Sequence, residues 1–237
     1  MTSTFDCTDP ALLSEGLARA QQAIAARQCV VLPTDTVYGI GADAFSAQAV
    51  ATLLAAKGRG RSMPPPVLIP RVQTMDGLAV DVPEQARALA EAFWPGGLTL
   101  ILHAQPSLTW DLGDTRGTVA LRMPDDPTAL ELLALTGPLA VSSANRTGSP
   151  AAATAAQARE QLGEAVEVYL EAGERTGASG PALASTIVDA TSLPLRVVRR
   201  GAVDLDRLRS VVPDVLDLGE EPGDVSGSSA GGEPAAG

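Results

Sequence analysis

Hydroxyl-bearing and charged side chains gather in five segments of this sequence, each next to a short apolar run. The first segment is VVLPTDTVYGIGADA, in which Thr34, Asp35 and Thr36 follow an apolar run that ends in proline. Open α/β sheets bind ligands at the carboxyl ends of their strands, so these side chains are candidates for ligand contact. The segment contains neither GxxxxGK(S/T) nor GxGxxG, the usual phosphate-loop patterns. The structural alternative is a polar turn ahead of a helix.

The second segment, AAKGRGRSMPPP, places Lys57, Arg59 and Arg61 on alternate positions between glycines. A glycine-rich loop with three cations suits a polyphosphate, because charge-assisted hydrogen bonds to phosphate oxygens are strong. Lys57 is also the single lysine among 17 basic residues, which indicates a position that needs a compact ammonium group. Two plainer explanations stay open: the cations stabilise the C-terminus of the preceding helix, or Lys57 is an ordinary surface lysine.

The third and fourth segments place polar groups at the ends of predicted strands. Arg122 closes the apolar run of GTVALRMP; an arginine there either clamps a carboxylate or phosphate or lays its stem along an apolar edge. In PLAVSSANRTG, a buried strand leads into Ser142, Ser143 and Asn145. Hydroxyls and backbone amides just after a strand form a good anion-binding turn.

The fifth segment, ASTIVDATSLPLRVVRRGAV, begins one strand near Ser185 and ends the next at Arg199; anion contact and a plain surface turn both stay open. A covalent nucleophile is not indicated, because the one histidine, His103, lies in the apolar strand-forming run LTLILHAQ and no GxSxG sequence directly follows a predicted strand. We interpret His103 as structural. Hydroxyls and cations without a nucleophile suit a reaction that depends on positioning and charge neutralisation, such as phosphoryl or nucleotidyl transfer.

The elements that must position these segments alternate along the chain. Alternating helical and strand patterns predict an α/β fold with one layered sheet. The predicted helices cover residues 10–27, 46–56, 83–93, 127–135, 154–162 and 205–211, and the predicted strands cover 29–32, 67–69, 98–102, 118–121, 139–142, 166–170, 186–188 and 195–198.

Composition excludes several classes of protein. No stretch approaches the roughly 18 apolar residues that a membrane span needs, and the first residues lack a signal-peptide pattern, so we expect a cytoplasmic protein. Cys7 and Cys29 form no CxxC pair, which argues against a disulfide framework or a structural zinc site. The net charge is −11, and six of the 28 acidic residues lie beyond residue 212 with no basic partner. Residues 1–212 therefore carry about −5, which gives no electrostatic surface for gripping nucleic acid.

The two parts of the chain have different compositions. Residues 1–212 form the predicted catalytic domain. Residues 213–237 are acidic and rich in glycine, serine and proline, a composition that cannot offset its own ordering entropy. We expect this second part to be a disordered tail.

Six ordered blocks carry a resemblance to a known family: PTDTVYGIGADA, KGRGR followed by prolines, WPGGLTLIL, VALRMP, SSANRTG and STIVD…RRGAV. Their order, over about residues 30–203, resembles the YrdC-type threonylcarbamoyl-AMP synthases in their short form, without the extra C-terminal domain. The resemblance implies a YrdC-like twisted mixed β-sheet flanked by helices, with a large concave cleft. It implies a nucleotidyltransferase that makes threonylcarbamoyl-AMP and pyrophosphate from L-threonine, bicarbonate and ATP with Mg²⁺.

The resemblance also implies a place in tRNA processing. The product would pass to a separate tRNA threonylcarbamoyl transferase that installs the t6A modification, and little or no contact of this chain with tRNA itself is expected.

The resemblance assigns a role to each matching residue. Lys57 and Arg59 are the implied catalytic pair on the nucleotide phosphates. The implied threonine contacts are Thr34, Arg122, Val141 and Ser185, and the further nucleotide contacts are Arg61, Thr118, Ser143, Asn145 and Arg199.

Some positions depart from the family pattern, and two other functions stay open. Leu68 stands where many members have a histidine near threonine, and Ala151 replaces a hydroxyl. A divergent member of the same fold could bind nucleotide without making the adenylate. An RNA-binding module is the alternative of another class, which the negative body and the 3% of aromatic residues disfavour.

Overall fold

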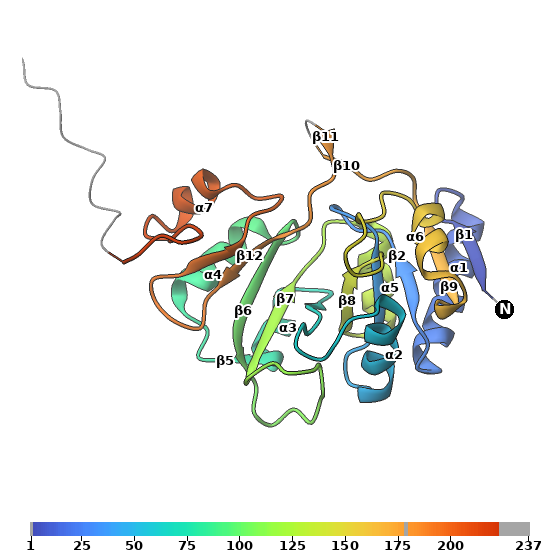
Figure 1. Cartoon of the computed structure of the whole chain (residues 1–237), viewed down its shortest axis with the longest axis horizontal. Coiled ribbons are helices and arrows are strands. Elements are labelled where there is room, and N and C mark those ends of the chain that lie inside the picture. Colours follow the sequence, from blue (N-terminus) through green and yellow to red (C-terminus); the bar gives the residue numbers. More distant parts are fainter. Residues whose placement is uncertain (1, 178–179, 223–237) are drawn as a thin grey trace, which may run out of the picture.

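A single mixed sheet organises the part of the chain that the computed structural model describes, residues 2–177 and 180–222. Its strand order is β1-β9-β2-β3-β8-β4-β7-β6-β12-β13, with β5 beside β6 (Figure 1). The sheet strands are β1 (Ser3–Asp6), β2 (Val30–Leu32), β3 (Gly39–Asp43), β4 (Val67–Leu68), β5 (Ala79–Val80), β6 (Leu98–Ala104), β7 (Thr118–Arg122), β8 (Leu139–Ser143), β9 (Val168–Glu171), β12 (Thr186–Asp189) and β13 (Arg196–Arg199). The pair β10 (Thr176–Gly177) and β11 (Gly180–Pro181) forms a separate hairpin.

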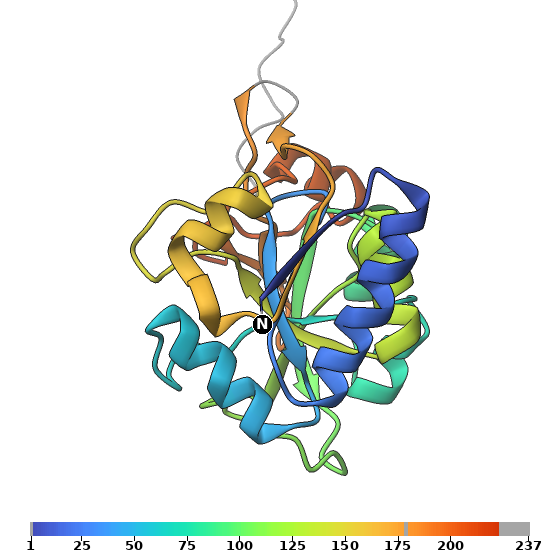
Figure 2. The ribbon, with the colours of Figure 1, turned by 90° about the vertical axis from the view of Figure 1, so that its right-hand side faces the viewer.

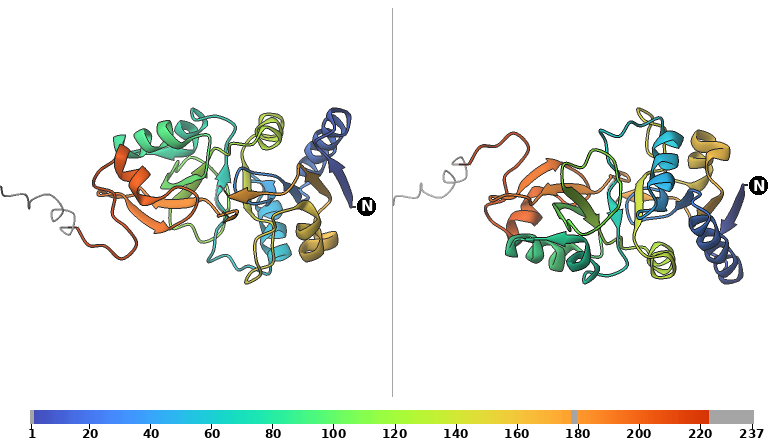
Figure 3. Two further views of the ribbon diagram at one scale, coloured as in Figure 1. Left: turned by 90° about the horizontal axis from the view of Figure 1, so that it is seen from above. Right: turned by 90° about the horizontal axis from the view of Figure 1, so that it is seen from below.

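Helices cover the sheet, so the expectation of a twisted mixed α/β sheet is confirmed. They are α1 (Pro10–Ala25), α2 (Ala47–Lys57), α3 (Thr74–Leu78), α4 (Glu84–Phe93), α5 (Pro127–Thr136), α6 (Ala155–Leu162) and α7 (Leu205–Val211), with a short 3-10 turn at Gly163–Ala165. Figure 3 shows α4 and α7 together at the end of the sheet opposite to α1 and β1. Within the described residues, no helix has both the length and the apolar character that crossing a bilayer requires.

The sheet separates two apolar layers near its β2 end. Side chains alternate along a strand: Val30 and Leu32 join the layer under α1 and α5, and Val31 between them joins the layer under α2 and α6. Figure 2 shows these helix pairs on opposite sides of the strands. This two-sided burial explains why β2 is apolar at every position.

Among the described strands, the sequence did not predict β1, β3 or the two-residue strands β5, β10 and β11. Strand β3 lies inside the first polar segment and is paired on both sides, with β2 and β8. A Cβ on Gly39 would come 2.6 Å from Cγ1 of Val141 on the neighbouring strand. Gly39 therefore allows side chains of β8 to pack closely against β3.

The C-terminal end of α2 determines the path of the second polar segment, residues 55–66. At the start of α2, the Ser46 side chain caps the helix by accepting the Ala49 amide. At its end, Gly58 has a φ of 62°, a left-handed conformation that favours glycine. The helix therefore stops at Lys57 and the chain turns toward Arg59.

The predicted boundary at residue 212 is too early. Val215 and Leu216 are buried, and Leu216 bridges to Arg196 beside β13. Two acidic residues of this segment pair with arginines of the body, Asp217 with Arg200 and Glu220 with Arg209. Apolar burial and ion pairing thus hold the chain on the body as far as Glu220. The rest of the predicted tail, residues 223–237, lies outside the described residues.

Candidate active site

A cavity of about 270 Å³ lies against the central strands of the sheet. Its wall includes three arginines, Arg59, Arg122 and Arg199, and no carboxylate among the described lining residues. The hydroxyl-bearing residues of the wall are Thr34, Thr36, Tyr38, Thr99, Thr115, Thr118, Ser142, Ser143 and Ser185. All five polar segments thus meet in one place, the second of them through Arg59 and the prolines that follow KGRGR.

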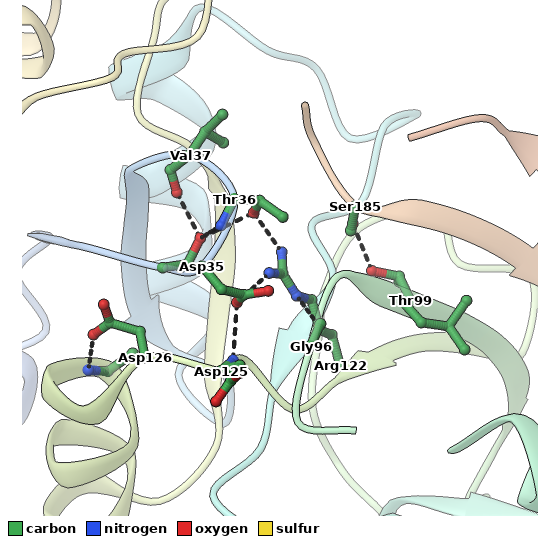
Figure 4. A network of polar contacts seen from close by, with 12 residues as sticks. Asp35, Thr36, Val37, Gly96, Thr99, Arg122, Asp125, Asp126 and Ser185 are labelled. Carbon is green, nitrogen blue, oxygen red and sulfur yellow. Dashed lines mark hydrogen bonds and ion pairs between the residues drawn. The ribbon is translucent and has the colours of Figure 1, made fainter. Parts of the chain in front are cut away.

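Arg122, at the end of β7, is buried and fixed by three different partners (Figure 4). Its Nε donates to the Gly96 carbonyl at 2.9 Å, Nη1 donates to Oγ1 of Thr36 at 2.9 Å and Nη2 donates to Oδ1 of Asp35 at 2.6 Å. A guanidinium has five N–H groups, so two remain for a ligand. An arginine held in this way presents a preset fork to a carboxylate or phosphate.

Thr34 belongs to the turn that holds Arg122. Its Oγ1 donates to the Val37 carbonyl at 2.7 Å and lies 3.0 Å from Oγ1 of Thr36. The side chain is buried, 3% exposed, and lines the cavity. The hydroxyls that were predicted as ligand contacts also stabilise the turn itself.

Ser185 and Arg199 form the opposite part of the wall. Oγ of Ser185 lies 2.8 Å from Oγ1 of Thr99 on β6. Arg199 donates from Nη2 to both the carbonyl and the Oγ of Ser185, at 2.6 and 3.0 Å. Burial, and then the positive charges of Arg122 and Arg59, lower the pKa of Arg199. The three arginines therefore lie within electrostatic reach of one another.

Arg59 is the least satisfied of the three arginines. Its Nη1 donates to Oγ of Ser142 at 3.1 Å, while its buried Nε has no hydrogen-bond partner within the described part of the chain. Burial lowers the pKa of the Arg59 guanidinium. A half-buried cation with an unused donor and no carboxylate partner among the described residues is suited to bind an anion.

Lys57 is placed behind the cavity wall and not in it. The side chain is 1% exposed, and Nζ donates to the backbone carbonyls of Ser143 and, at 2.6 Å, of Asn145. Burial, and then the charge of Arg59, lower the pKa of Lys57 to about 8. In this structure the compact ammonium group serves the backbone of the turn after β8.

Two other residues with an implied role on the nucleotide also lie outside the cavity wall. Arg61 is exposed and pairs with Asp111 at 2.8 Å. Asn145 donates from Nδ2 to the carbonyls of Arg146 and Ser149, and its buried Oδ1 has no partner among the described residues. The remaining predicted residues, Thr118, Val141 and Ser143, line the cavity.

The sequence did not single out every polar residue of the cavity. Thr99 is fully buried within the apolar strand β6 and contacts Ser185. The one feature of the sequence that could have indicated it is a single threonine within the apolar run LTLILHA. The pairing of Asp35 with Arg122 joins positions far apart in the sequence, and local spacing carries no signal for it. Leu68, a departure from the family pattern, also lies in the wall.

The fold and this cavity define a class of protein: a mixed α/β sheet with an arginine- and hydroxyl-lined cavity whose charge suits an anionic ligand. The family profile Sua5_yciO_yrdC, described as "Telomere recombination", matches residues 22–201. The chain belongs to the Sua5/YciO/YrdC family.

Named relatives agree with this membership. A "Putative threonylcarbamoyl-AMP synthase" of Mycobacterium tuberculosis H37Rv is 55% identical over 212 residues, covering 90% of this chain and 96% of the relative. A "Threonylcarbamoyl-AMP synthase" of Bacillus subtilis is 33% identical over 223 residues, covering 92% of this chain and 62% of the longer relative.

Solved structures show the same fold. Pyrococcus abyssi Sua5, solved in complex with L-threonine, superposes with a TM-score of 0.80 at 30% identity, covering 89% of this chain and 60% of that chain. Escherichia coli YciO superposes with a TM-score of 0.74 at 21% identity, covering 88% of this chain and all of that chain.

Proposed function

We propose that this protein is an L-threonylcarbamoyladenylate synthase, a nucleotidyltransferase that converts L-threonine, bicarbonate and ATP into threonylcarbamoyl-AMP and pyrophosphate. The names of its relatives support this function. The observation that carries it is the cavity itself, where three arginines converge: Asp35 pairs with Arg122, and no carboxylate of the described residues pairs with Arg59 or Arg199. Such a wall fits substrates that bring carboxylate and phosphate charges with them.

Threonine would bind at the Arg122 side of the cavity. The fixed guanidinium of Arg122 has two free N–H groups for the threonine carboxylate, in the bidentate geometry that carboxylates favour. Thr34 and Ser185 offer hydroxyls nearby, and Val141 contributes to the wall at the end of β8. Leu68 adds apolar surface to the same wall.

The nucleotide would bind at the side formed by Arg59, Arg199 and the turn after β8. The two guanidinium groups would neutralise phosphate charge, while Ser143 and Thr118 offer hydroxyls to the nucleotide. Mg²⁺ would arrive as part of the MgATP substrate. The described residues gather no cluster of three histidine, cysteine or acidic side chains for a metal, so phosphate oxygens and water suit the ion as ligands.

The reaction needs no covalent intermediate on the protein. The threonine amine adds to bicarbonate with loss of water and gives a carbamate. A carbamate oxygen then forms a bond to the α-phosphorus, and the bond from that phosphorus to the pyrophosphate oxygen breaks. The arginines would stabilise the charge that builds on the phosphates, and Arg122 would hold the amino acid in line for attack. The adenylate would then pass to a separate transferase that modifies tRNA.

The deciding experiment is pyrophosphate release by the purified protein with MgATP. We expect release that requires both L-threonine and bicarbonate. ATP binding without release would contradict the synthase and favour a divergent nucleotide-binding member. Absence of both, together with salt-sensitive RNA binding, would favour an RNA-binding module instead.

A further inference from the structure

The ammonium group of Lys57 is held between backbone carbonyls of one turn. Its Nζ donates to the carbonyls of Ser143 and Asn145, and the Lys57 carbonyl in turn accepts the Thr147 amide at 2.9 Å. The last residue of α2 therefore contacts the turn at three points. A charged donor between neutral carbonyls makes strong hydrogen bonds. Removing it would leave the buried Asn145 carbonyl without its described donor, whereas the Ser143 carbonyl also accepts the Asn145 amide at 2.9 Å.

This turn forms part of the cavity wall. Ser143 and the preceding Ser142 line the cavity, and Oγ of Ser142 accepts from Arg59 at 3.1 Å. The Ala144 amide donates to the Tyr38 carbonyl at 2.7 Å, which joins the turn to β3. A chain of contacts thus runs from Lys57 through the turn and Ser142 to the Arg59 guanidinium.

Lys57 itself does not reach the cavity in this structure. Its side chain is 1% exposed and is absent from the residues of the wall, whereas Arg59, two residues later, is part of it. A flexible loop that offered three cations to a phosphate would leave the lysine exposed. The observed burial shows a lysine used for packing and backbone contact.

We infer that Lys57 is a positioning residue for the proposed reaction: it fixes the Ser143–Asn145 turn and, through Ser142, the guanidinium of Arg59 that meets the phosphates. The inference rests on the proposed function, because it names ATP as the ligand of this wall. It differs from the role that the sequence implied for Lys57, direct contact with phosphate.

A double-mutant cycle on ATP affinity tests this inference, with Lys57→Met, Arg59→Met and the double variant. Each single change should weaken ATP binding by about tenfold. If Lys57 acts through Arg59, the double variant should bind ATP about as weakly as the weaker single variant. If each cation touches phosphate separately, the losses should multiply to about a hundredfold, and that result would overturn the inference.

Amide hydrogen exchange of the ligand-free protein gives an independent readout at residues 143–149. Lys57→Met should speed exchange in this turn, while Arg59→Met, the matched control, should leave it unchanged. Equal exchange in Lys57→Met and the wild type would overturn the positioning role.

Lys57→Arg keeps the inference falsifiable if Lys57→Met does not fold. A guanidinium is too large for the site of the ammonium between the two carbonyls, so Lys57→Arg should lose ATP affinity although it keeps the charge. Near wild-type affinity in Lys57→Arg would overturn the inference. Failure of the proposed function is seen elsewhere, as absence of threonine-dependent pyrophosphate release by the wild type.

Discussion

Asp35 and Arg122 form a buried ion pair that joins the turn after β2 to the end of β7. Nη2 of Arg122 donates to Oδ1 of Asp35 at 2.6 Å, and the same oxygen accepts the Asp125 amide at 2.9 Å. The Asp35 and Arg122 side chains are 18% and 7% exposed. One carboxylate oxygen thus orients the guanidinium from one side while its remaining N–H groups stay available to a substrate.

Replacing Asp35 should therefore weaken threonine binding without removing the arginine. Asp35→Asn keeps an acceptor oxygen but loses the charge that orients Arg122, so we expect the KM for threonine to rise about tenfold with a smaller change in kcat. Steady-state pyrophosphate release at varied threonine measures both. Asp76→Asn is the matched control, because Asp76 forms an exposed pair with Arg87. An unchanged KM in Asp35→Asn would contradict the positioning of Arg122 by this carboxylate.

Arg122→Lys tests the clamp itself. A lysine keeps one positive charge but offers a point donor in place of a planar fork, so the threonine KM should rise on the order of 10- to 100-fold. ATP affinity measured without threonine should change little, because the proposed phosphate contacts come from Arg59 and Arg199. Equal losses for threonine and ATP would show that Arg122 does not discriminate between the two substrates.

Gly201→Ala tests how closely the chain packs behind Ser185. A Cβ at residue 201 would lie 2.2 Å from the Ala184 carbonyl oxygen and 2.6 Å from the Ser185 carbonyl carbon, both backbone atoms. The substitution should cost about 2 to 3 kcal/mol, lower Tm by about 5 to 10 °C and displace Ser185 and Arg199 from the wall. Thermal unfolding and pyrophosphate release would be measured together.

Gly77→Ala is the control for that substitution. A Cβ on Gly77 in α3 would meet open space, so the alanine should be neutral or stabilise the helix by up to about 1 kcal/mol. A Gly201→Ala protein as stable and active as Gly77→Ala would contradict the tight packing at the Ser185 turn.

The sequence predicted a helix or strand well where the spacing of its apolar residues and their intrinsic secondary-structure propensity indicated the same element. Helices with strong apolar periodicity were placed to within a few residues, for example the helix predicted at 83–93 and observed as Glu84–Phe93. Strand β3 escaped prediction because GIGAD has low strand propensity; its pairing with β2 and β8 overrides that preference. The short strand β1 pairs with β9, about 165 positions later, and local sequence does not show such a partner.

The sequence predicted which residues lie near the site, but not the direction in which each side chain points. Spacing brought Lys57, Arg59 and Arg61 to one loop, yet only Arg59 lines the cavity. The ammonium of Lys57 is drawn inward by two backbone carbonyls, and Arg61 is drawn outward by Asp111. These partners lie 50 or more residues away, so the direction of each side chain depends on tertiary contacts that no local motif contains.

The titration of Lys57 offers a direct test of its burial, because it is the single lysine of the chain. Burial and Arg59 lower its pKa from 10.5 to about 8. As pH falls below about 10, the unfolded chain binds this proton first, and the folded protein follows only near pH 8. The free energy of unfolding from this group should therefore decrease as pH falls across that window and then stay level.

Selective ¹⁵N-lysine labelling should give one side-chain signal that titrates near pH 8 in the folded protein. Arg59→Met removes a repelling charge, so the midpoint should move upward in that variant. Comparing urea unfolding of the wild type with that of Lys57→Met at several pH values isolates this group from the other titrations. A midpoint near 10.5, the ordinary value for an exposed lysine, would mean that the ammonium is solvated and that the turn is held by something other than Lys57.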